Sequence, residues 1–428
     1  MSLAAWVCIG VFLVLMFLKV PVFVSVMAGT CTYLALTPSA NGIVVVQKII
    51  TGMGGLTLLA IPFFIFSGVL MNSSGITKRI MNLCVALTGR FTGSLAQVNV
   101  LLSTMMGGLS GSNLADAAME AKLLVPEMEE RGYSKEFSSV VTAVSAMITP
   151  LIPPGIGMIV YGSLANASVG RLFAAGISVG LLLMVFMLIL NYIICKKRNY
   201  GSIRKDKLGH GELRKAVKEA ILPLCLPVFI IGGIRIGLVS PTEAGAFCVV
   251  FSVILGLCYK ELNWKKLMDA FKETVRSTAS IMMIIGAVSS VAWVFTVERV
   301  PQRLLEFMVN NIESKYVFLL LVNIFLIVVG MFVEGNAAAC MLIPILVPIA
   351  KAYGIDPIHF GMIWVFNMSI GGITPPMGTL MYVTCGVTGC KIKAFITEAV
   401  PYLIMLGIIL LMVTYIPGIS TWLVNILW

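Results

Sequence analysis

The chain has 428 residues, of which 59% are apolar, and its 30 basic and 19 acidic side chains give a net charge of +11. Charged residues make up 11% of the chain, whereas a soluble domain carries about 25%, so a water-soluble globule is excluded. A membrane-spanning helix needs about 20 mainly apolar residues. We therefore expect an all-α, multi-pass membrane protein with about a dozen spans and no room for an aqueous catalytic domain.

Long apolar runs predict the spans in chain order. The first run, residues 3–18, has no basic segment before it and no small-residue cleavage site after it, so we expect a span and not a signal peptide. The other predicted spans are residues 22–36, 56–71, 80–106, 140–161, 172–195, 220–238, 244–259, 277–297, 317–333, 360–372 and 399–416. Such continuous runs differ from the alternating segments of a membrane β-barrel.

A basic segment divides the chain into two halves. Residues 196–218 contain nine basic and two acidic side chains, a net charge of +7. The basic ones are Lys196, Lys197, Arg198, Arg204, Lys205, Lys207, Arg214, Lys215 and Lys218. Basic loops beside spans stay in the cytoplasm, so we expect a cytoplasmic loop at residues 196–219, near anionic membrane lipid. Because these charges flank membrane spans, nucleic acid is not an expected partner.

Residues 260–276 are predicted to return to the cytoplasmic side after two further spans. Their sequence, KELNWKKLMDAFKETVR, places apolar residues at helical spacing among lysines. This pattern predicts an interfacial helix that lies along the membrane surface. Between the two preceding spans, Arg235 and Glu243 are expected to cap a short turn.

Cysteine and histidine usage indicates no metal or haem centre. The ten cysteines are scattered through apolar runs without a C-x-x-C pair, and the only histidines are His210 and His359. Neither a disulfide framework nor a zinc or haem site is predicted, and we expect no organic cofactor.

An internal repeat is the most informative feature of the chain. Pro-Pro occurs only twice, at Pro153-Pro154 and Pro375-Pro376. Going back 28 residues from the second proline of each pair leads to Pro126 and Pro348, and a glycine follows each of these after six residues. One offset of 222 residues therefore aligns the two halves.

Each half thus contains a Gly-rich polar stretch, a short apolar arm, a turn and a span broken by Pro-Pro. Adjacent prolines free backbone carbonyl groups that lipid cannot satisfy, so the broken backbone is expected to line a polar cavity or an ion site. The arms, residues 117–125 and 339–347, are too short to cross a membrane alone. We predict that each forms a re-entrant hairpin with the segment before it, with its tip at residues 110–113 or 334–336.

Hairpin tips of this composition suit two kinds of ligand. Helix N-termini expose N–H groups that suit a carboxylate, while hydroxyl groups and freed carbonyls suit a hard cation such as Na⁺. Paired repeats then predict two cation sites around one anion site, which is the architecture of a secondary transporter. Asp116 and Glu334 lie between apolar segments and are functional candidates for that reason.

Simpler roles stay open for single residues. Gly107, Gly108 and Gly111 suit close helix packing. The polar residues of the first tip could satisfy neighbouring backbone groups, and Asp116 could instead lie among headgroups with Lys122 as its counter-charge. The repeat favours the site interpretation, because it joins both polar tips to both Pro-Pro breaks.

Several long motifs follow one another over nearly the whole chain. They are SGSNLADAA with LLVPEMEERGYS, ITPLIPPGIGMIVYG, VSPTEAGA, MLIPILVPIAKAYGIDPIHFG and GGITPPMGTLMYV. In this order they resemble the large membrane subunit of the tripartite ATP-independent periplasmic (TRAP) transporters. The resemblance implies an inverted-repeat fold with two re-entrant hairpins, and a Na⁺-coupled elevator mechanism without ATP hydrolysis.

The resemblance also implies a place and partners. The chain would lie in the bacterial inner membrane beside a small four-helix membrane subunit encoded as a separate chain. A periplasmic solute-binding protein would deliver the substrate, a small organic acid such as a dicarboxylate, a sugar acid like sialic acid, or a keto acid. Na⁺ would be the coupling ion.

Three sets of site residues are carried over to this sequence. The first Na⁺ site would use Ser110, Ser112 and the carbonyls of Thr149, Ile152 and Pro154. The second Na⁺ site would use Glu334, Gly371, Thr374 and Pro376. Substrate would contact Ser112, Asn113, Asn336, Pro154 and Pro376, with Asp116 as a further functional residue. Glu334 departs from the aspartate common in the family, and its extra methylene moves the carboxylate oxygens.

The repeats predict a division into five segments. They are scaffold helices at 1–106, a first transport repeat at 107–195, the basic loop at 196–219, a second scaffold segment at 220–316, and a second transport repeat with the last span at 317–428. The nearest alternative function is a stand-alone sodium–carboxylate symporter without a binding protein. An intramembrane hydrolase using Asp116 and Glu334 as an acid pair, or a structural scaffold, would leave the duplicated breaks unexplained.

Overall fold

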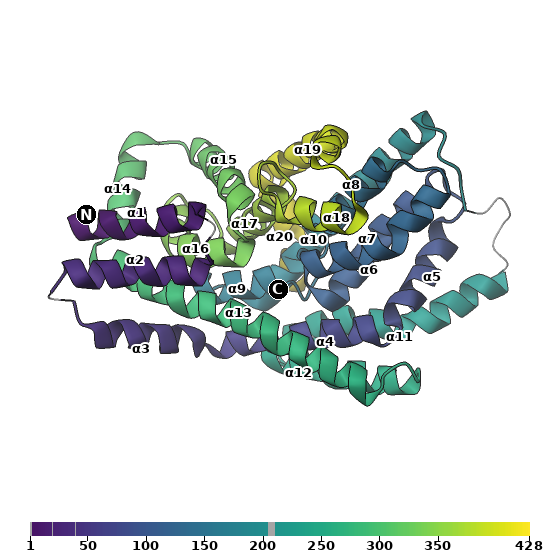
Figure 1. The fold of residues 1–428 in the computed structure, drawn as a ribbon, viewed down its shortest axis with the longest axis horizontal. Helices are drawn as coiled ribbons and strands as arrows, with labels where there is room; N and C mark the ends of the chain where they lie inside the picture. The colour runs from purple at the N-terminus through teal and green to yellow at the C-terminus, as the bar shows by residue number, and fades with distance from the viewer. Residues whose placement is uncertain (1, 19, 39, 204–209) are drawn as a thin grey trace.

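The computed structural model describes residues 2–18, 20–38, 40–203 and 210–428. In these residues every regular element is a helix, and Figure 1 shows the helices packed into one elongated body. Eight of the described helices are long and apolar enough to cross a membrane. The prediction of an all-α, multi-pass membrane protein is confirmed.

Helices α1 (Leu3–Phe17), α2 (Val22–Leu36) and α3 (Gly42–Met53) lie together at one end of the body (Figure 1). The 3₁₀ helix η1 (Leu56–Leu59) follows, and α4 (Ala60–Ser73) and α5 (Ile76–Thr88) lead toward the opposite end, where α5 packs against α11. The predicted span 80–106 is wrong, because the chain turns between α5 and α6 (Ser94–Ser110). At this turn Gly93 has a left-handed φ of 69° and packs against Cys195, where a side chain would collide.

The predicted repeat is present as two matching runs of five helices. The first run is α6, α7 (Asn113–Glu130), α8 (Lys135–Ser145), α9 (Ile156–Ala165) and α10 (Val169–Lys197). The second run is α15 (Lys315–Phe332), α16 (Gly335–Ala352), α17 (Pro357–Gly371), α18 (Thr379–Thr388) and α19 (Ile392–Tyr415). Since α6 corresponds to α15, the first hairpin includes residues 94–106, which the segment prediction assigned to the scaffold.

Both hairpin arms are longer than predicted. The second arm of the first hairpin, α7, runs through Pro126, and its counterpart α16 runs through Pro344 and Pro348. The arms therefore do not end at these prolines. A proline inside a membrane helix is tolerated when neighbouring helices satisfy the freed backbone. The Pro-Pro pairs do break their helices, at the segments between α8 and α9 and between α17 and α18.

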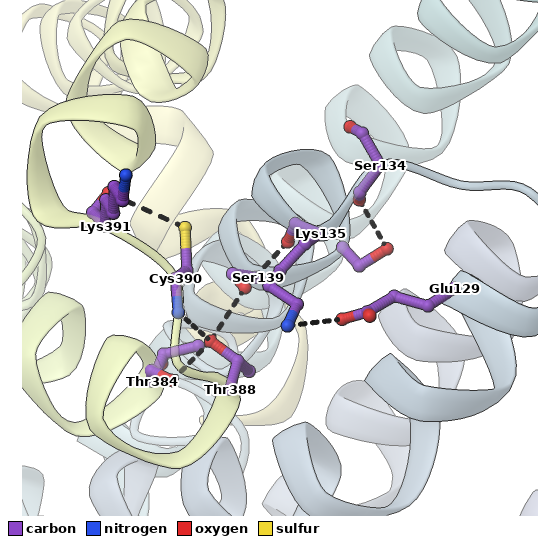
Figure 2. A network of polar contacts seen from close by, with 9 residues as sticks. Glu129, Ser134, Lys135, Ser139, Thr384, Thr388, Cys390 and Lys391 are labelled. Atoms are coloured by element: carbon purple, nitrogen blue, oxygen red, sulfur yellow. Dashed lines mark hydrogen bonds and ion pairs between the residues drawn. The ribbon is translucent and has the colours of Figure 1, made fainter.

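The two repeats interlock. The second piece of the first broken helix, α9, packs against α16 of the second hairpin, while α18 packs against α7 of the first hairpin. Figure 2 shows one joint in this arrangement, where Ser139 on α8 donates to Thr388 at the end of α18 over 3.0 Å. Lys135 at the start of α8 forms an ion pair with Glu129 on α7 at 3.6 Å. The repeats thus form a single packed unit.

The remaining helices flank this unit. They are α11 (His210–Arg235), α12 (Pro241–Cys258), α13 (Trp264–Val297), α14 (Val300–Asn311) and α20 (Pro417–Leu427). Helix α13 packs along α2, α3 and α4 and also reaches α16. The predicted interfacial helix at 260–276 is wrong, since most of it is the first part of the continuous 34-residue α13. No proline interrupts α13, so the amphipathic segment and the next span form one helix.

The basic segment is only partly a loop. Lys196 and Lys197 form the last turn of α10, and α11 begins at His210, so three of the predicted loop's basic residues are helical in α11. Arg204, Lys205 and Lys207 lie outside the described residues. The predicted cap at Glu243 is present, because its carboxylate accepts from the Ser240 N–H while its own N–H donates to the Ser240 hydroxyl. Arg235 instead donates to the Leu427 carbonyl on α20.

Candidate functional site

One pocket of about 950 Å³ brings both hairpin tips together. Its polar lining from the tips is Ser110, Ser112, Asn113, Glu334 and Asn336. The two broken helices add Pro150, Ile156, Gly372 and Thr379, and α4 and α13 supply the facing wall. Residues more than 200 positions apart thus share one cavity, as the repeat predicts.

The first tip lies directly against the first Pro-Pro break. Gly111 has a left-handed φ of 63°, and a side chain there would collide with the carbonyl of Pro154. Gly107, one turn earlier on α6, has a similarly close contact with the backbone of Thr149, since an added Cβ would lie 2.9 Å from the Thr149 Cα. Gly107 and Gly111 therefore pack closely, as the simpler role predicted. They pack against the backbone of Thr149 and Pro154, two residues of the predicted first Na⁺ site.

Asp116 organises the first tip from inside. Its side chain is 0% exposed, and its Oδ2 accepts from the Ser110 hydroxyl at 2.6 Å and from the Thr149 hydroxyl at 2.9 Å. Asp116 therefore does not lie among headgroups, and the exposed Lys122 forms no ion pair with it. A hydroxyl that donates its hydrogen to a carboxylate keeps its oxygen lone pairs for a cation.

The broken backbone beside Ser110 supplies further oxygens. The carbonyls of Thr149, Ile152 and Pro154 accept no backbone or side-chain hydrogen bond from the described chain. Unsatisfied carbonyls together with hydroxyl oxygens are the ligands that a hard monovalent cation takes in broken transporter helices. The residues predicted for the first Na⁺ site thus have the chemistry for it.

The second tip is built differently. Glu334 precedes α16, and its carboxylate accepts from the backbone N–H groups of Asn336 at 3.0 Å and Ala337 at 3.2 Å, and from the Asn336 side chain at 2.9 Å. The carboxylate thus caps its own helix. At the second break, the Gly371 carbonyl accepts from Thr374 N, and the Thr374 hydroxyl donates to the Ile370 carbonyl at 2.7 Å. The Pro376 carbonyl accepts only from the Tyr382 hydroxyl, at 3.4 Å.

The two tips also differ in what they offer a substrate. At the start of α7, the N–H groups of Asn113 and Leu114 donate to no partner within the described chain, and both residues line the pocket. Ser112 caps this helix only through a long 3.5 Å bond from Ala115 N. Glu334 occupies the N-terminus of α16, so a carboxylate of the chain already caps this helix end, unlike that of α7. Asp116 and Glu334 bond to separate partners and form no acid pair.

Sequence reasoning missed three further residues. Arg276 on α13 and Glu120 and Ser103 beneath the first tip were not named. Arg276 and the exposed Lys122 both line the pocket, and so does Glu273 on α13, so its lining includes two cationic side chains together with the acidic Glu273 and Glu334. Glu120 is 0% exposed and accepts from the Ser103 hydroxyl at 2.6 Å. Its spacing of four residues from Asp116 on an apolar arm was the available signal.

Comparisons with known proteins identify the family and agree with the fold. The family model described as the tripartite ATP-independent periplasmic transporter, DctM component, matches residues 9–419. The chain is 39% identical over 404 residues to the sialic acid TRAP transporter large permease protein SiaM of Vibrio cholerae, with 94% of each chain covered. It is 35% identical over 435 residues to the C4-dicarboxylate TRAP transporter large permease protein DctM of the same organism, with 96% of each covered.

A solved structure shares the fold. The YdaH transporter of Alcanivorax borkumensis superposes with a TM-score of 0.59 at 14% sequence identity, covering 89% of this chain and 88% of that one. The relatives are named as transporter permeases, so the chain is a multi-pass membrane transporter component and not an enzyme. It belongs to the DctM family, the large membrane components of the tripartite ATP-independent periplasmic transporters.

Proposed function

We propose that this chain is the membrane subunit through which a bacterial inner membrane imports a small organic acid, driven by Na⁺. The observation that carries the proposal is the single pocket in which both hairpin tips and both broken helices meet. It combines free N–H groups suited to a carboxylate with hydroxyl and carbonyl oxygens suited to Na⁺. The substrate is a dicarboxylate, a sugar acid such as sialic acid, or a keto acid.

The substrate carboxylate binds at the first tip. The unpartnered N–H groups of Asn113 and Leu114 and the side chains of Ser112 and Asn336 face the same cavity. Lys122 and Arg276 add positive charge on two sides of it. The predicted substrate contacts through Pro154 and Pro376 lie behind these groups, at the breaks.

Na⁺ binds between each tip and its Pro-Pro break. At the first site Asp116 draws the hydrogens of Ser110 and Thr149 toward itself, so their oxygens face the ion together with the carbonyls of Thr149, Ile152 and Pro154. At the second site Glu334 supplies charge, and Gly371, Thr374 and Pro376 supply oxygens. Bound Na⁺ holds each tip against its break and thereby completes the substrate site.

Transport follows an elevator mechanism. The interlocked repeats, α6–α10 and α15–α19, move as one body against α1–α5 and α11–α14. The crossed packing of α9 on α16 and of α18 on α7 supports this division, because neither repeat can move without the other. The transporter has two protein partners, a periplasmic binding protein that delivers the substrate and a small four-helix membrane subunit.

Uptake into proteoliposomes tests the proposal. The chain is reconstituted with its small subunit, an inward Na⁺ gradient is applied, and uptake of labelled organic acids is measured with and without the binding protein. We expect uptake only when Na⁺ and the binding protein are both present. Uptake with Na⁺ alone would favour the stand-alone symporter, and uptake indifferent to Na⁺ would refute the ion sites.

A further inference from the structure

A second buried carboxyl lies beneath the first tip. Glu120 follows Asp116 by one helical turn on α7, and both side chains are 0% exposed. Beyond its first two residues, α7 lines the pocket with Ala115, Ala118, Met119 and Lys122, so the two acids occupy the face turned away from the cavity. Water in the pocket therefore does not solvate either carboxyl.

Each of the two carboxyls has one oxygen without a partner. Ser103 donates to Oε2 of Glu120 at 2.6 Å, and Ser110 and Thr149 donate to Oδ2 of Asp116. Oε1 of Glu120 and Oδ1 of Asp116 are buried and accept no hydrogen bond in the described chain. A buried carboxylate oxygen without a donor or cation is costly, so each of these oxygens requires a bound cation or a proton.

The surroundings of Glu120 favour a proton over a metal ion. The titratable groups that interact with Glu120 are Asp116 on its own helix and the Cys84 thiol on α5. Cys84 in turn contacts the Met105 sulfur at 3.7 Å. From α6 the only polar contact is Ser103, and within the described residues α8 and α18 contribute no hydrogen bond or ion pair to Glu120. One hydroxyl and soft sulfur atoms do not form a Na⁺ coordination shell.

We propose that Glu120 is a proton-binding site that makes Na⁺ binding at the first tip depend on pH. Glu120 carries a proton on its free oxygen while the Na⁺ site is empty. When Na⁺ binds beside Asp116, the O–H bond of Glu120 breaks, the electron pair stays on the carboxylate, and solvent water takes up the proton. The link to Na⁺ rests on the proposed function, whereas the proton on Glu120 does not.

The physical link is the spacing of the two acids. Side chains four residues apart on a helix lie about 6 Å from each other at their Cβ atoms. Two buried negative charges at that distance are tolerated only with a cation nearby, so Na⁺ at Ser110 and Thr149 favours loss of the proton. By reciprocity, a proton on Glu120 weakens Na⁺ binding by the same factor.

Infrared spectroscopy of the purified chain tests the proton directly. In Na⁺-free buffer near neutral pH, the wild type should show the C=O stretch of a buried protonated carboxyl. Glu120→Gln should lose this band, and the isosteric amide keeps the oxygen that accepts from Ser103, so the fold is preserved. Glu130→Gln, an exposed acid at the end of the same helix, should keep the band. A band that persists in Glu120→Gln would overturn the proposal.

Binding of radioactive Na⁺ to the same proteins tests the link. For the wild type and Glu130→Gln, we expect the Kd for Na⁺ to rise about tenfold when the pH falls from 8 to 6. For Glu120→Gln, the Kd for Na⁺ should change by less than about twofold over the same range. Wild-type pH dependence in Glu120→Gln would overturn the link. If no protein binds Na⁺ at any pH, the proposed Na⁺ sites and the link fail together, while the infrared result still decides whether Glu120 holds a proton.

Discussion

The two hairpin tips share one backbone plan and place their acidic groups differently. Aligned by the repeat, Ser112 corresponds to Glu334 and Asp116 to Ala338. The first tip holds its carboxylate inside the hairpin, where it orients hydroxyl groups. The second tip holds its carboxylate at the helix end, where it caps N–H groups. The first helix end therefore offers the N–H groups of two residues to an anionic ligand, whereas the second already has two of its N–H groups bonded to its own carboxylate.

This difference shows how a duplicated unit becomes asymmetric. Two tips of equal chemistry would compete for the same substrate carboxylate in the shared pocket. Closing α16 with Glu334 leaves the N-terminus of α7 as the place where an anion gains most from the helix dipole and free N–H groups. The predictions below test this division, from the largest expected effect to the smallest.

Asp116→Asn should have the largest effect. Loss of the charge weakens the hydrogen bonds that orient Ser110 and Thr149, because hydrogen bonds to a charged group are worth about 1.5–3 kcal/mol and those to a neutral amide oxygen are worth less. We expect the Na⁺ concentration for half-maximal uptake to rise by about 10- to 100-fold. Asp269→Asn, at an exposed position on α13, is the matched control. A wild-type Na⁺ curve for Asp116→Asn would contradict the role of the first tip.

Glu334→Ala should separate the capping role from the charge. Removing an N-cap costs about 1 kcal/mol of stability, because the Asn336 and Ala337 N–H groups lose their acceptor. Glu334→Gln keeps an oxygen that can cap but removes the charge. We therefore expect the thermal stability in detergent to fall mainly for Glu334→Ala. The Na⁺ dependence of uptake should weaken for both variants. Equal stability of Ala and wild type would show that the cap contributes nothing.

Ser112→Ala and Thr374→Ala compare one position at each site. Each removes one oxygen from the proposed Na⁺ sites. Ser112 accepts only the long 3.5 Å bond from Ala115 N, and the Thr374 hydroxyl donates locally to the Ile370 carbonyl, so neither joins distant helices. We expect the half-maximal Na⁺ concentration for uptake to rise by about threefold to tenfold, the loss of one neutral hydrogen-bonding group. Expression should stay near the wild-type level. Wild-type Na⁺ curves for both variants would refute the site assignment.

Asn99→Ala and Asn323→Ala should affect stability and leave Na⁺ dependence unchanged. Asn99 on α6 bonds to Thr142 and Ser145, both at 2.7 Å, and Asn323 on α15 bonds to Thr414 and Asn367. Both joints connect a hairpin helix to its broken helix, through Ser145 on α8 and its repeat counterpart Asn367 on α17, and Asn323 also reaches Thr414 on α19. Buried partners left unsatisfied cost about 1–3 kcal/mol. Thermal unfolding measures the loss, and a shifted Na⁺ curve at normal stability would assign these joints to the ion sites.

Local composition was enough to predict the class, the repeat and the positions of the hairpin tips and helix breaks. Long apolar runs indicate membrane-spanning helices directly. A Pro-Pro pair breaks a helix whatever surrounds it. The tips at 110–113 and 334–336 and the breaks beside them were therefore predicted correctly. Single prolines are weaker signals, because packed neighbours can satisfy the one bond they remove. That is why the arms ending at Pro126 and Pro348 were predicted too short.

The sequence by itself thus determined an all-α membrane protein with two copies of a hairpin and a broken helix. Only the tertiary structure decided which groups meet, because hydrogen-bond partners come from helices far apart in the chain. Thr149 reaches Asp116 across 33 positions, and α9 and α18 cross to the opposite repeats. The packing of α7 also decided the environment of its two acids. The sequence alone allowed Asp116 and Glu120 to face headgroups, whereas the structure buries both side chains.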